Sequence, residues 1–301
     1  MQVIDIHTHV YPKVAGITQG QPMTSLSNGK VMIGNTKKQF LPPAFIHSNS
    51  TTDVLIDYMD WRGIEKALLM PNPYYGYFND YFKQSVQKYP DRLKGVALVN
   101  LLDGQKAADE LAAIYEEGIL FGFKIETDST FQCRPSARMT DAEFASIWDC
   151  CNQYHQPVFI HPFRNCDVED LQKLVVLYPQ INFVICHMGA DACFGKGVRE
   201  ENFGDVMRMV KDHSNVYIDT STVPDFFPES YPWPSAANVI ETCCNMVGAE
   251  KIMWASDYPG MLRHGTLKQL IDLVAVECRN LSENDRKLIL AENARRLFFA
   301  D

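Results

Sequence analysis

Eight short apolar runs recur along the chain, each separated from the next by a segment with helical periodicity. The runs are almost continuously apolar rather than alternating, which is typical of parallel strands buried on both faces. They occupy residues 3–6, 66–70, 95–100, 121–125, 157–160, 183–186, 216–219 and 252–255. We therefore predict a parallel α/β sheet that runs through the whole chain.

The intervening segments carry helix-forming residues and end signals such as Gly63 and Gly118. Helices are expected over 52–61, 107–117, 141–154 and 167–177, and near 201–213, 235–247 and 265–278. Eight repeats of strand and helix predict closure into a (β/α)8 TIM barrel, with an open doubly wound sheet as the alternative. A barrel of this size accounts for residues 1–301 as a single domain.

Residues 11–50 interrupt this pattern between the first strand and the first helix. The segment is rich in Gly, Ser, Asn and Pro, and its centre, 23–40, alternates around Ser27-Asn28-Gly29. An Asn-Gly pair between alternating flanks predicts a β-hairpin. An insertion that leaves the first strand lies over the carboxyl end of the barrel, so we predict a lid. A surface loop and a subunit interface are the alternatives.

Charge and cysteine content narrow the class of protein. The formal net charge of -9 argues against nucleic acid or an anionic membrane as partner, but it says nothing further about the small-molecule substrate that we expect. Nine cysteines form no Cys-x-x-Cys motif and include the adjacent pairs Cys150-Cys151 and Cys243-Cys244, a pattern unlike a disulfide framework or a thiolate zinc site. With no apolar run of membrane-spanning length, we expect a cytoplasmic protein.

Polar residues follow the ends of several predicted strands, where a barrel gathers its functional side chains. Residues i and i+2 of an extended chain point to the same side, so His7 and His9 can bind one ion. His161, His187 and Asp257 follow three further strands. Imidazoles with a carboxylate suit one divalent ion, zinc first, with manganese, iron or cobalt compatible with the same geometry.

Five motifs in this order resemble the amidohydrolase superfamily, specifically amidohydrolase family 2, the aminocarboxymuconate-semialdehyde decarboxylase-like group. They cover essentially the whole chain and read Ile4-Asp5-Ile6-His7-Thr8-His9, Phe159-Ile160-His161-Pro162, Cys186-His187-Met188-Gly189, Ser256-Asp257-Tyr258-Pro259 and Glu292-Asn293-Ala294-Arg295-Arg296-Leu297-Phe298. The resemblance implies that His7, His9 and His161 bind the metal. It also implies a homo-oligomer, most simply a dimer.

The resemblance further implies that Asp257 is a fourth ligand that handles a proton. His187 would lie just off the metal, as an acid/base group or as a clamp on a substrate oxygen. A divalent ion lowers the pKa of water, Asp257 can take the proton released, and His187 can polarise a carbonyl. Asp219, after the seventh strand, is a candidate to orient His187 or a metal ligand.

Three more residues are candidates for substrate binding, each with a structural alternative. Arg164 follows His161 and suits a substrate carboxylate, although an arginine in a polar loop is commonly just solvated. Lys124, near the end of the fourth strand, is assigned to the substrate; superfamily members with two metals carry a bridging carbamylated lysine near this place. Tyr74 is a candidate wall for an apolar or aromatic substrate, with packing as the alternative.

The same residues serve hydrolases of lactones or amides and non-oxidative decarboxylases of unsaturated or aromatic acids. Some aromatic-acid decarboxylases of this group carry glutamate where this chain has His7, whereas Tyr11-Pro12-Lys13 resembles the semialdehyde decarboxylases. Few basic residues follow the strands. We therefore predict a metal-dependent hydrolase of a small lactone, amide or carboxylic acid, with a decarboxylase second and a non-catalytic ligand-binding barrel third.

Overall fold

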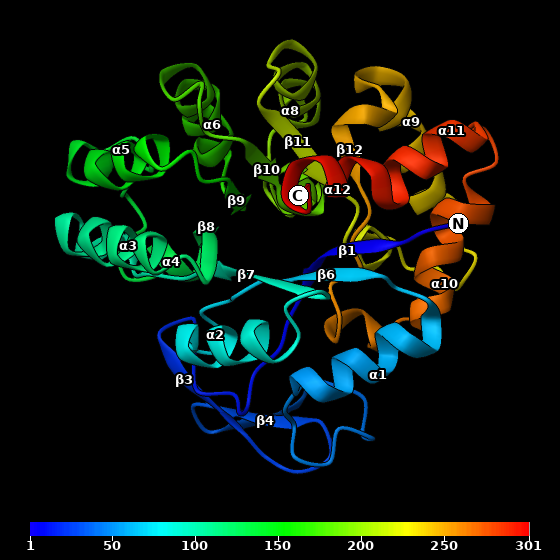
Figure 1. Cartoon of the computed structure of the whole chain (residues 1–301), viewed down its shortest axis with the longest axis horizontal. Helices are drawn as coiled ribbons and strands as arrows, with labels where there is room; N and C mark the ends of the chain where they lie inside the picture. The colour runs from blue at the N-terminus through cyan, green and yellow to red at the C-terminus, as the bar shows by residue number, and fades with distance from the viewer. Residues whose placement is uncertain (301) are drawn as a thin grey trace.

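The computed structural model describes residues 1–300, and its centre is a ring of eight parallel strands surrounded by helices (Figure 1). Every predicted strand is present, with ends within a few residues of the prediction. The barrel strands are β1 (Ile4–Thr8), β6 (Lys66–Leu69), β7 (Leu93–Ala97), β8 (Leu120–Glu126), β9 (Val158–His161), β10 (Phe183–Ile185), β11 (Val216–Asp219) and β12 (Ile252–Met253).

The strands follow one another around the barrel in chain order, β1-β6-β7-β8-β9-β10-β11-β12, and all pairs are parallel. The ring closes between β1 and the segment after β12. There the His9 amide donates to the Tyr258 carbonyl at 2.7 Å, and the Asp257 amide donates to the His7 carbonyl at 2.9 Å. The TIM barrel is confirmed and the open doubly wound sheet is excluded.

Helices on the outside connect successive strands. Among them, α1 begins at the N-cap Thr51 and ends at Gly63, whose φ of 71° suits glycine. The prediction missed α2 and the short helices α4, α7, α11 and α12. The helices are α1 (Thr52–Arg62), α2 (Asn79–Lys88), α3 (Gln105–Glu117), α4 (Thr127–Phe131), α5 (Ala145–Gln153), α6 (Asn165–Leu177), α7 (Ala190–Phe194), α8 (Glu201–Asp212), α9 (Pro234–Val247), α10 (Leu267–Asp272), α11 (Glu283–Lys287) and α12 (Asn293–Phe298).

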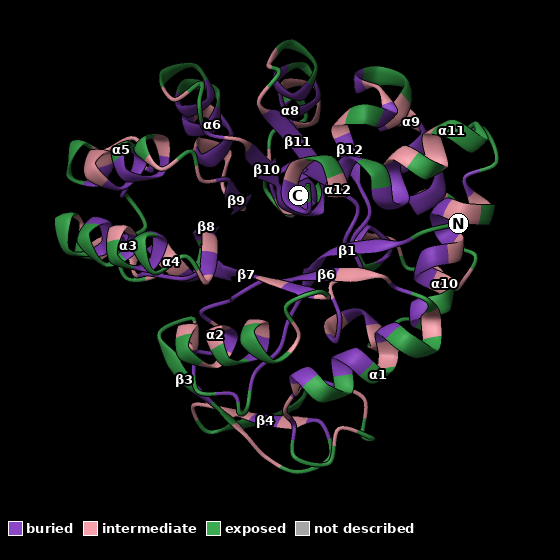
Figure 2. Ribbon diagram, in the orientation of Figure 1, coloured by how far each residue is buried: buried purple, intermediate pink, exposed green. Residues whose placement is uncertain are grey.

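Two apolar layers bury the strands, as the purple centre of Figure 2 shows. One layer packs the strands against the helices. The other fills the barrel interior with Ile4, Ile6, Phe159 and Val184, and Phe298 of α12 packs against it. Apolar side chains therefore occupy one end of the barrel, and the polar strand ends gather at the other.

The insertion after β1 forms a separate antiparallel sheet of β2 (Ile17–Thr18), β3 (Gln21–Ser25), β4 (Lys30–Ile33) and β5 (Thr36–Gln39). The predicted hairpin joins β3 to β4, and Asn28 and Gly29 have φ of 59° and 70°. A second hairpin, β4 to β5, was not predicted. The insertion packs Met23, Val31 and Leu41 in one apolar cluster with Tyr75, which follows β6.

Two smaller expectations concern cysteines and membranes. All nine cysteines are free thiols, as their pattern predicted. Among the described residues, helices are too short or too polar to cross a bilayer.

Candidate active site

The polar strand ends line a cavity of about 330 Å³. Its walls combine aromatic rings with four carboxylates, three histidines and one arginine. The lining residues are His9, Phe40, Asn72, Tyr74, Tyr75, Glu126, His161, Phe163, His187, Asp191, Thr222, Asp225, Phe226, Asp257, Gly260 and Arg263. Phe40 follows β5, so the insertion supplies part of the wall.

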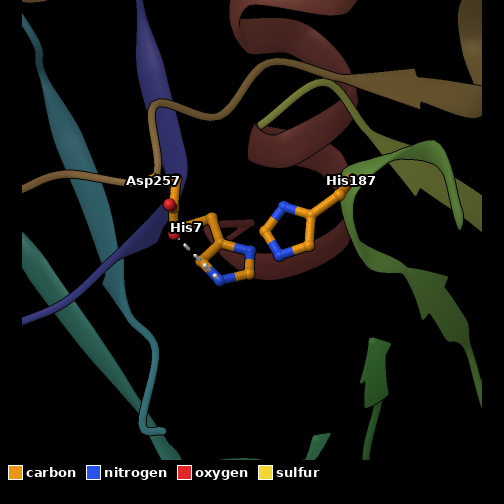
Figure 3. Close-up of side chains that lie close together, drawn as sticks. All are labelled: His7, His187 and Asp257. Atoms are coloured by element: carbon orange, nitrogen blue, oxygen red, sulfur yellow. Dashed lines mark ion pairs between the residues drawn. The ribbon is translucent and has the colours of Figure 1, made fainter. Parts of the chain in front are cut away.

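His7 is fully buried at the end of β1, in contact with His9, His187 and Asp257 of the cavity lining. Its Nδ1 is 3.1 Å from Oδ2 of Asp219, which ends β11. Its Nε2 points the other way, 3.8 Å from Oδ1 of Asp257. Figure 3 shows Asp257 beside His7 and the ring of His187 on its other side. Burial, with the charge of Lys124, keeps the pKa of His7 well below its usual value.

His9 approaches the same carboxylate, with Nε2 2.9 Å from Oδ1 of Asp257. The other ring nitrogen, Nδ1, is 2.6 Å from the Met70 carbonyl. A carbonyl can only accept, so Nδ1 carries the proton and a neutral His9 presents an Nε2 lone pair to a carboxylate oxygen. Two such atoms repel unless a proton or a cation lies between them. The donor set therefore fits a divalent cation, with coordinating atoms typical of zinc or manganese sites.

Side chains of His7, His187 and Asp257 place ligand atoms within 4.8 Å of one another. A second cluster of His7, Cys186 and Asp219 meets the same limit but is fully buried. The Lys124 ammonium donates to Cys186 Sγ at 3.4 Å, and this charge opposes a cation there. We therefore place the candidate metal centre beside His7 and Asp257, where His9 approaches the same carboxylate and His187 lies close by.

His161, predicted as a third imidazole ligand, is turned toward two other carboxylates. Its Nδ1 bonds Glu126, and its Nε2 is 2.7 Å from Oδ2 of Asp191. Its ring centroid lies 4.1 Å from that of His187. Burial opposes a charge on His161, but Glu126 and Asp191 outweigh it and raise its pKa to about 9. The two carboxylates favour the protonated form of His161, and Nε2 would have to leave Asp191 before it could ligate a metal.

Lys124, predicted to contact the substrate, does not line the cavity. The side chain is fully buried, with Nζ 3.0 Å from Oε2 of Glu126. Burial opposes its charge, but Cys186 and Glu126 hold its pKa above the usual value. In this arrangement the ammonium is paired with Glu126 and does not line the cavity. The residue of β8 that faces the cavity is Glu126, two positions further on.

Arg164, predicted to bind a substrate carboxylate, has its guanidinium at the start of α6. Nε and Nη2 donate to Oδ1 of Asp167 at 2.9 and 2.6 Å. Nη1 donates to the carbonyls of Pro135 and Ala137, and the group stacks 4.4 Å from the Phe131 ring. These contacts occupy its donors away from the cavity. Tyr74 does line the cavity, where its hydroxyl donates to Oδ2 of Asp128 at 2.6 Å.

Four charged residues of the cavity lining were not predicted, and only one of them had a usable sequence signal. Glu126 lies two residues after Lys124 on the same strand, so the period of a strand places both on one side. Asp191 is the second residue of α7. Asp225 and Arg263 lie in short helical turns that follow β11 and β12. No periodicity marks such positions, because loops place their side chains by tertiary contacts.

Comparison with known protein families shows to which family the chain belongs. A model of the amidohydrolase family matches residues 4–300, almost the whole chain. The chain belongs to the amidohydrolase family. The family match begins at the first residue of β1 and ends beyond α12, so it includes the histidines of β1, the insertion and Asp257.

Solved structures of similar fold include amidohydrolases with different activities. A probable 2-pyrone-4,6-dicarboxylic acid hydrolase from Acinetobacter baumannii, with citric acid bound, has a TM-score of 0.70 at 19% identity, covering 99% of this chain and 100% of its own. 5-Carboxyvanillate decarboxylase from Sphingomonas paucimobilis has a TM-score of 0.64 at 18% identity, covering 99% of both chains. The corresponding enzyme from Novosphingobium aromaticivorans, with manganese bound, has a TM-score of 0.57 at 21% identity, covering 80% of this chain and 79% of its own.

Proposed function

We propose that this chain is a metal-dependent hydrolase that cleaves a small lactone, amide or carboxylic-acid derivative. The observation that carries the proposal is the approach of two imidazole Nε2 atoms to one carboxylate oxygen, at 3.8 Å from His7 and 2.9 Å from His9. This arrangement suits a cation held between the imidazoles and the carboxylate, and Asp257 also lines the cavity in which a substrate would bind. A metal centre open to a small cavity is the arrangement that hydrolysis requires.

His7, His9 and Asp257 would hold the cation, with His187 in reach of the same cluster and His161 able to join on release from Asp191. We propose zinc, because nitrogen ligands outnumber oxygen ligands; the manganese in one similar structure makes manganese the second choice. When bound, the ion supplies Lewis-acid stabilisation of an oxygen anion and lowers the pKa of water.

The protein side chains then handle the protons. Asp257 accepts a proton from the attacking water and returns it to the leaving group, a role worth about 10²- to 10⁴-fold in rate. His187, on the other side of His7, exchanges a proton with the substrate (Figure 3). Tyr74, Tyr75 and Phe163 give the cavity aromatic walls suited to a flat, partly apolar substrate.

Decarboxylation is the second candidate, and one feature of the cavity favours it. Arg263 is the one lysine or arginine among the described residues of the lining, and it can bind the carboxylate of an acid. Two of the similar structures are decarboxylases of aromatic acids. Both reactions use the same metal centre and the same two proton-transfer groups.

Isotope labelling separates the two reactions. The zinc- or manganese-loaded protein is incubated with lactones, amides and unsaturated or aromatic acids in water enriched in oxygen-18. A hydrolase incorporates the label into the product, whereas a decarboxylase releases carbon dioxide and takes a solvent proton at carbon. The Asp257→Asn variant is the negative control. If the loaded protein turns over no member of either class while still binding metal, the non-catalytic alternative is favoured.

Two finer assignments accompany the proposal. Nine free thiols suit a reducing compartment, so we propose that the enzyme acts in the cytoplasm. We also propose a homodimer, which gel filtration with light scattering would test directly.

A further inference from the structure

The side chain of Asp219 collects hydrogen bonds from two functional histidines. It is fully buried at the end of β11. Its Oδ2 faces Nδ1 of His7 at 3.1 Å. Its Oδ1 accepts hydrogen bonds from the backbone amides of His187, at 2.8 Å, and of Ser221, at 3.0 Å. Because both amides can only donate, Oδ1 is an acceptor.

Ser221 adds a third hydrogen bond to the same oxygen, donated by its hydroxyl. A hydroxyl has a single proton, and here the proton goes to Asp219. The Oγ atom also lies 2.6 Å from Nδ1 of His187. It can therefore only accept from that nitrogen, which must carry a proton.

From this chain of contacts we infer that Ser221 is a positioning residue that sets the tautomer of His187, with the proton on Nδ1 and the lone pair on Nε2. In a neutral imidazole one nitrogen donates and the other accepts, so the Nδ1 proton leaves Nε2 as the acceptor. This tautomer makes His187 a proton acceptor at the start of the reaction, a role that rests on the proposed function. It can donate to an oxyanion only after taking that proton.

The backbone around His187 shows that its ring is held in place. His187 and Met188 have φ of 57° and 55°, in the left-handed region that side chains other than glycine seldom occupy. Such strain persists where surrounding contacts over-determine it. Here the amide of His187 is held by Asp219 and its ring by Ser221. The turn after β10 thus directs the ring into the cavity with a defined nitrogen exposed.

Nuclear magnetic resonance of protein labelled with nitrogen-15 histidine tests the assignment without a substrate. The His187→Gln variant identifies the signals of His187 in the zinc-loaded protein. We expect the one-bond coupling to hydrogen at Nδ1 and not at Nε2. In Ser221→Ala this pattern changes to a mixture or to the other tautomer, and Ser221→Thr, which keeps the hydroxyl, restores it.

Ser235→Ala is the matched control, because that serine also donates to a carboxylate, Oε1 of Glu229, at 2.5 Å but lies outside the cavity lining. It leaves the His187 signals unchanged. A proton on Nε2 in the native protein, or an unchanged pattern in a folded Ser221→Ala, overturns the inference. Once a substrate is known, Ser221→Ala should lower kcat about 10- to 100-fold with little change in KM. Failure of turnover in every variant would refute the proposed function but not the tautomer.

Discussion

His9 and Asp257 face each other across the seam where β1 meets the segment after β12, with Nε2 and Oδ1 2.9 Å apart. The Met70 carbonyl holds the proton of His9 on Nδ1, so the nitrogen that faces Asp257 carries a lone pair when the ring is neutral. A cation between the two resolves the repulsion.

We therefore predict about one divalent ion per chain in the purified protein, as a single centre of this kind holds. Mass-spectrometric metal analysis should show the ion lost in the His7→Ala/His9→Ala double variant. His47→Ala, at an exposed histidine of the insertion, should retain it. Two ions per chain would require a second centre near Glu126 and Asp191. A native protein that stays metal-free after reconstitution would contradict the proposed centre.

Asp257→Asn should abolish most of the activity and leave the fold intact. Asp257 has a φ of 53°, and asparagine is among the residues that tolerate this conformation. The amide cannot take a proton from water, so kcat should fall about 10²- to 10⁴-fold. Thermal melting of the metal-stripped variant should match that of the metal-stripped native protein. Asp212→Asn, an exposed change on α8, should keep full activity.

Arg263 should select for a carboxylate on the ligand. Its Nε donates to the Gly260 carbonyl at 3.0 Å, which holds the guanidinium at the cavity wall. Calorimetry with benzoate and benzamide, which have the same shape, measures the selection without turnover. Arg263→Gln should weaken benzoate about 10-fold, roughly 1.4 kcal/mol, and leave benzamide unchanged. Arg279→Gln, at a side chain 83% exposed, is the control. Equal effects on both ligands would refute an anion site.

Asp5 should make stability depend on pH. Burial raises its pKa to about 7 from 3.8, against the hydrogen bonds from Ser256 and His7. The folded chain therefore keeps the proton where the unfolded chain has lost it. Between these two pKa values, the contribution of Asp5 to the free energy of unfolding therefore falls by about 1.4 kcal/mol for each pH unit.

The Asp5→Asn variant does not titrate and so isolates this contribution. Urea unfolding of the metal-stripped proteins measures the free energy of unfolding. Relative to the native protein, this free energy should increase in the variant as pH rises from about 4 to about 7, the window set by the two pKa values. Above this window the difference should stay constant. A difference that stays constant across this window would mean that Asp5 is ionised in the fold.

Gly29 should be essential for the insertion to hold its place at the cavity. A Cβ at this position would lie 2.3 Å from the Leu41 carbonyl oxygen, and the Gly29 carbonyl accepts from Phe40 at 2.8 Å. Gly29→Ala should therefore speed proteolysis within 11–50 and raise KM. Gly20→Ala is a matched control, because its φ of 71° is similar but no atom lies within 4 Å of the added carbon. Equal effects of the two would show that backbone strain alone is responsible.

The amino-acid sequence alone determined the barrel and the positions of its strand-end residues. Each buried parallel strand must be apolar on both faces, so eight runs can be counted, and the polar residue after each run lies at the same end. His7, His9 and Asp257 were predicted as site residues in this way, and the structure brings them close together. The Asn28-Gly29 hairpin was found because its turn requires positive φ at successive residues.

Only the tertiary structure decided what the side chains contact. Lys124 and Glu126 are neighbours on one strand, yet one is sealed beneath the cavity and the other lines it. The Arg164 guanidinium donates to Asp167, and Nε2 of His161 faces Asp191. Local periodicity specifies the face of an element, whereas charge pairing and burial depend on segments distant in the chain. The partners of a buried charge are therefore set by packing, and no local pattern records them.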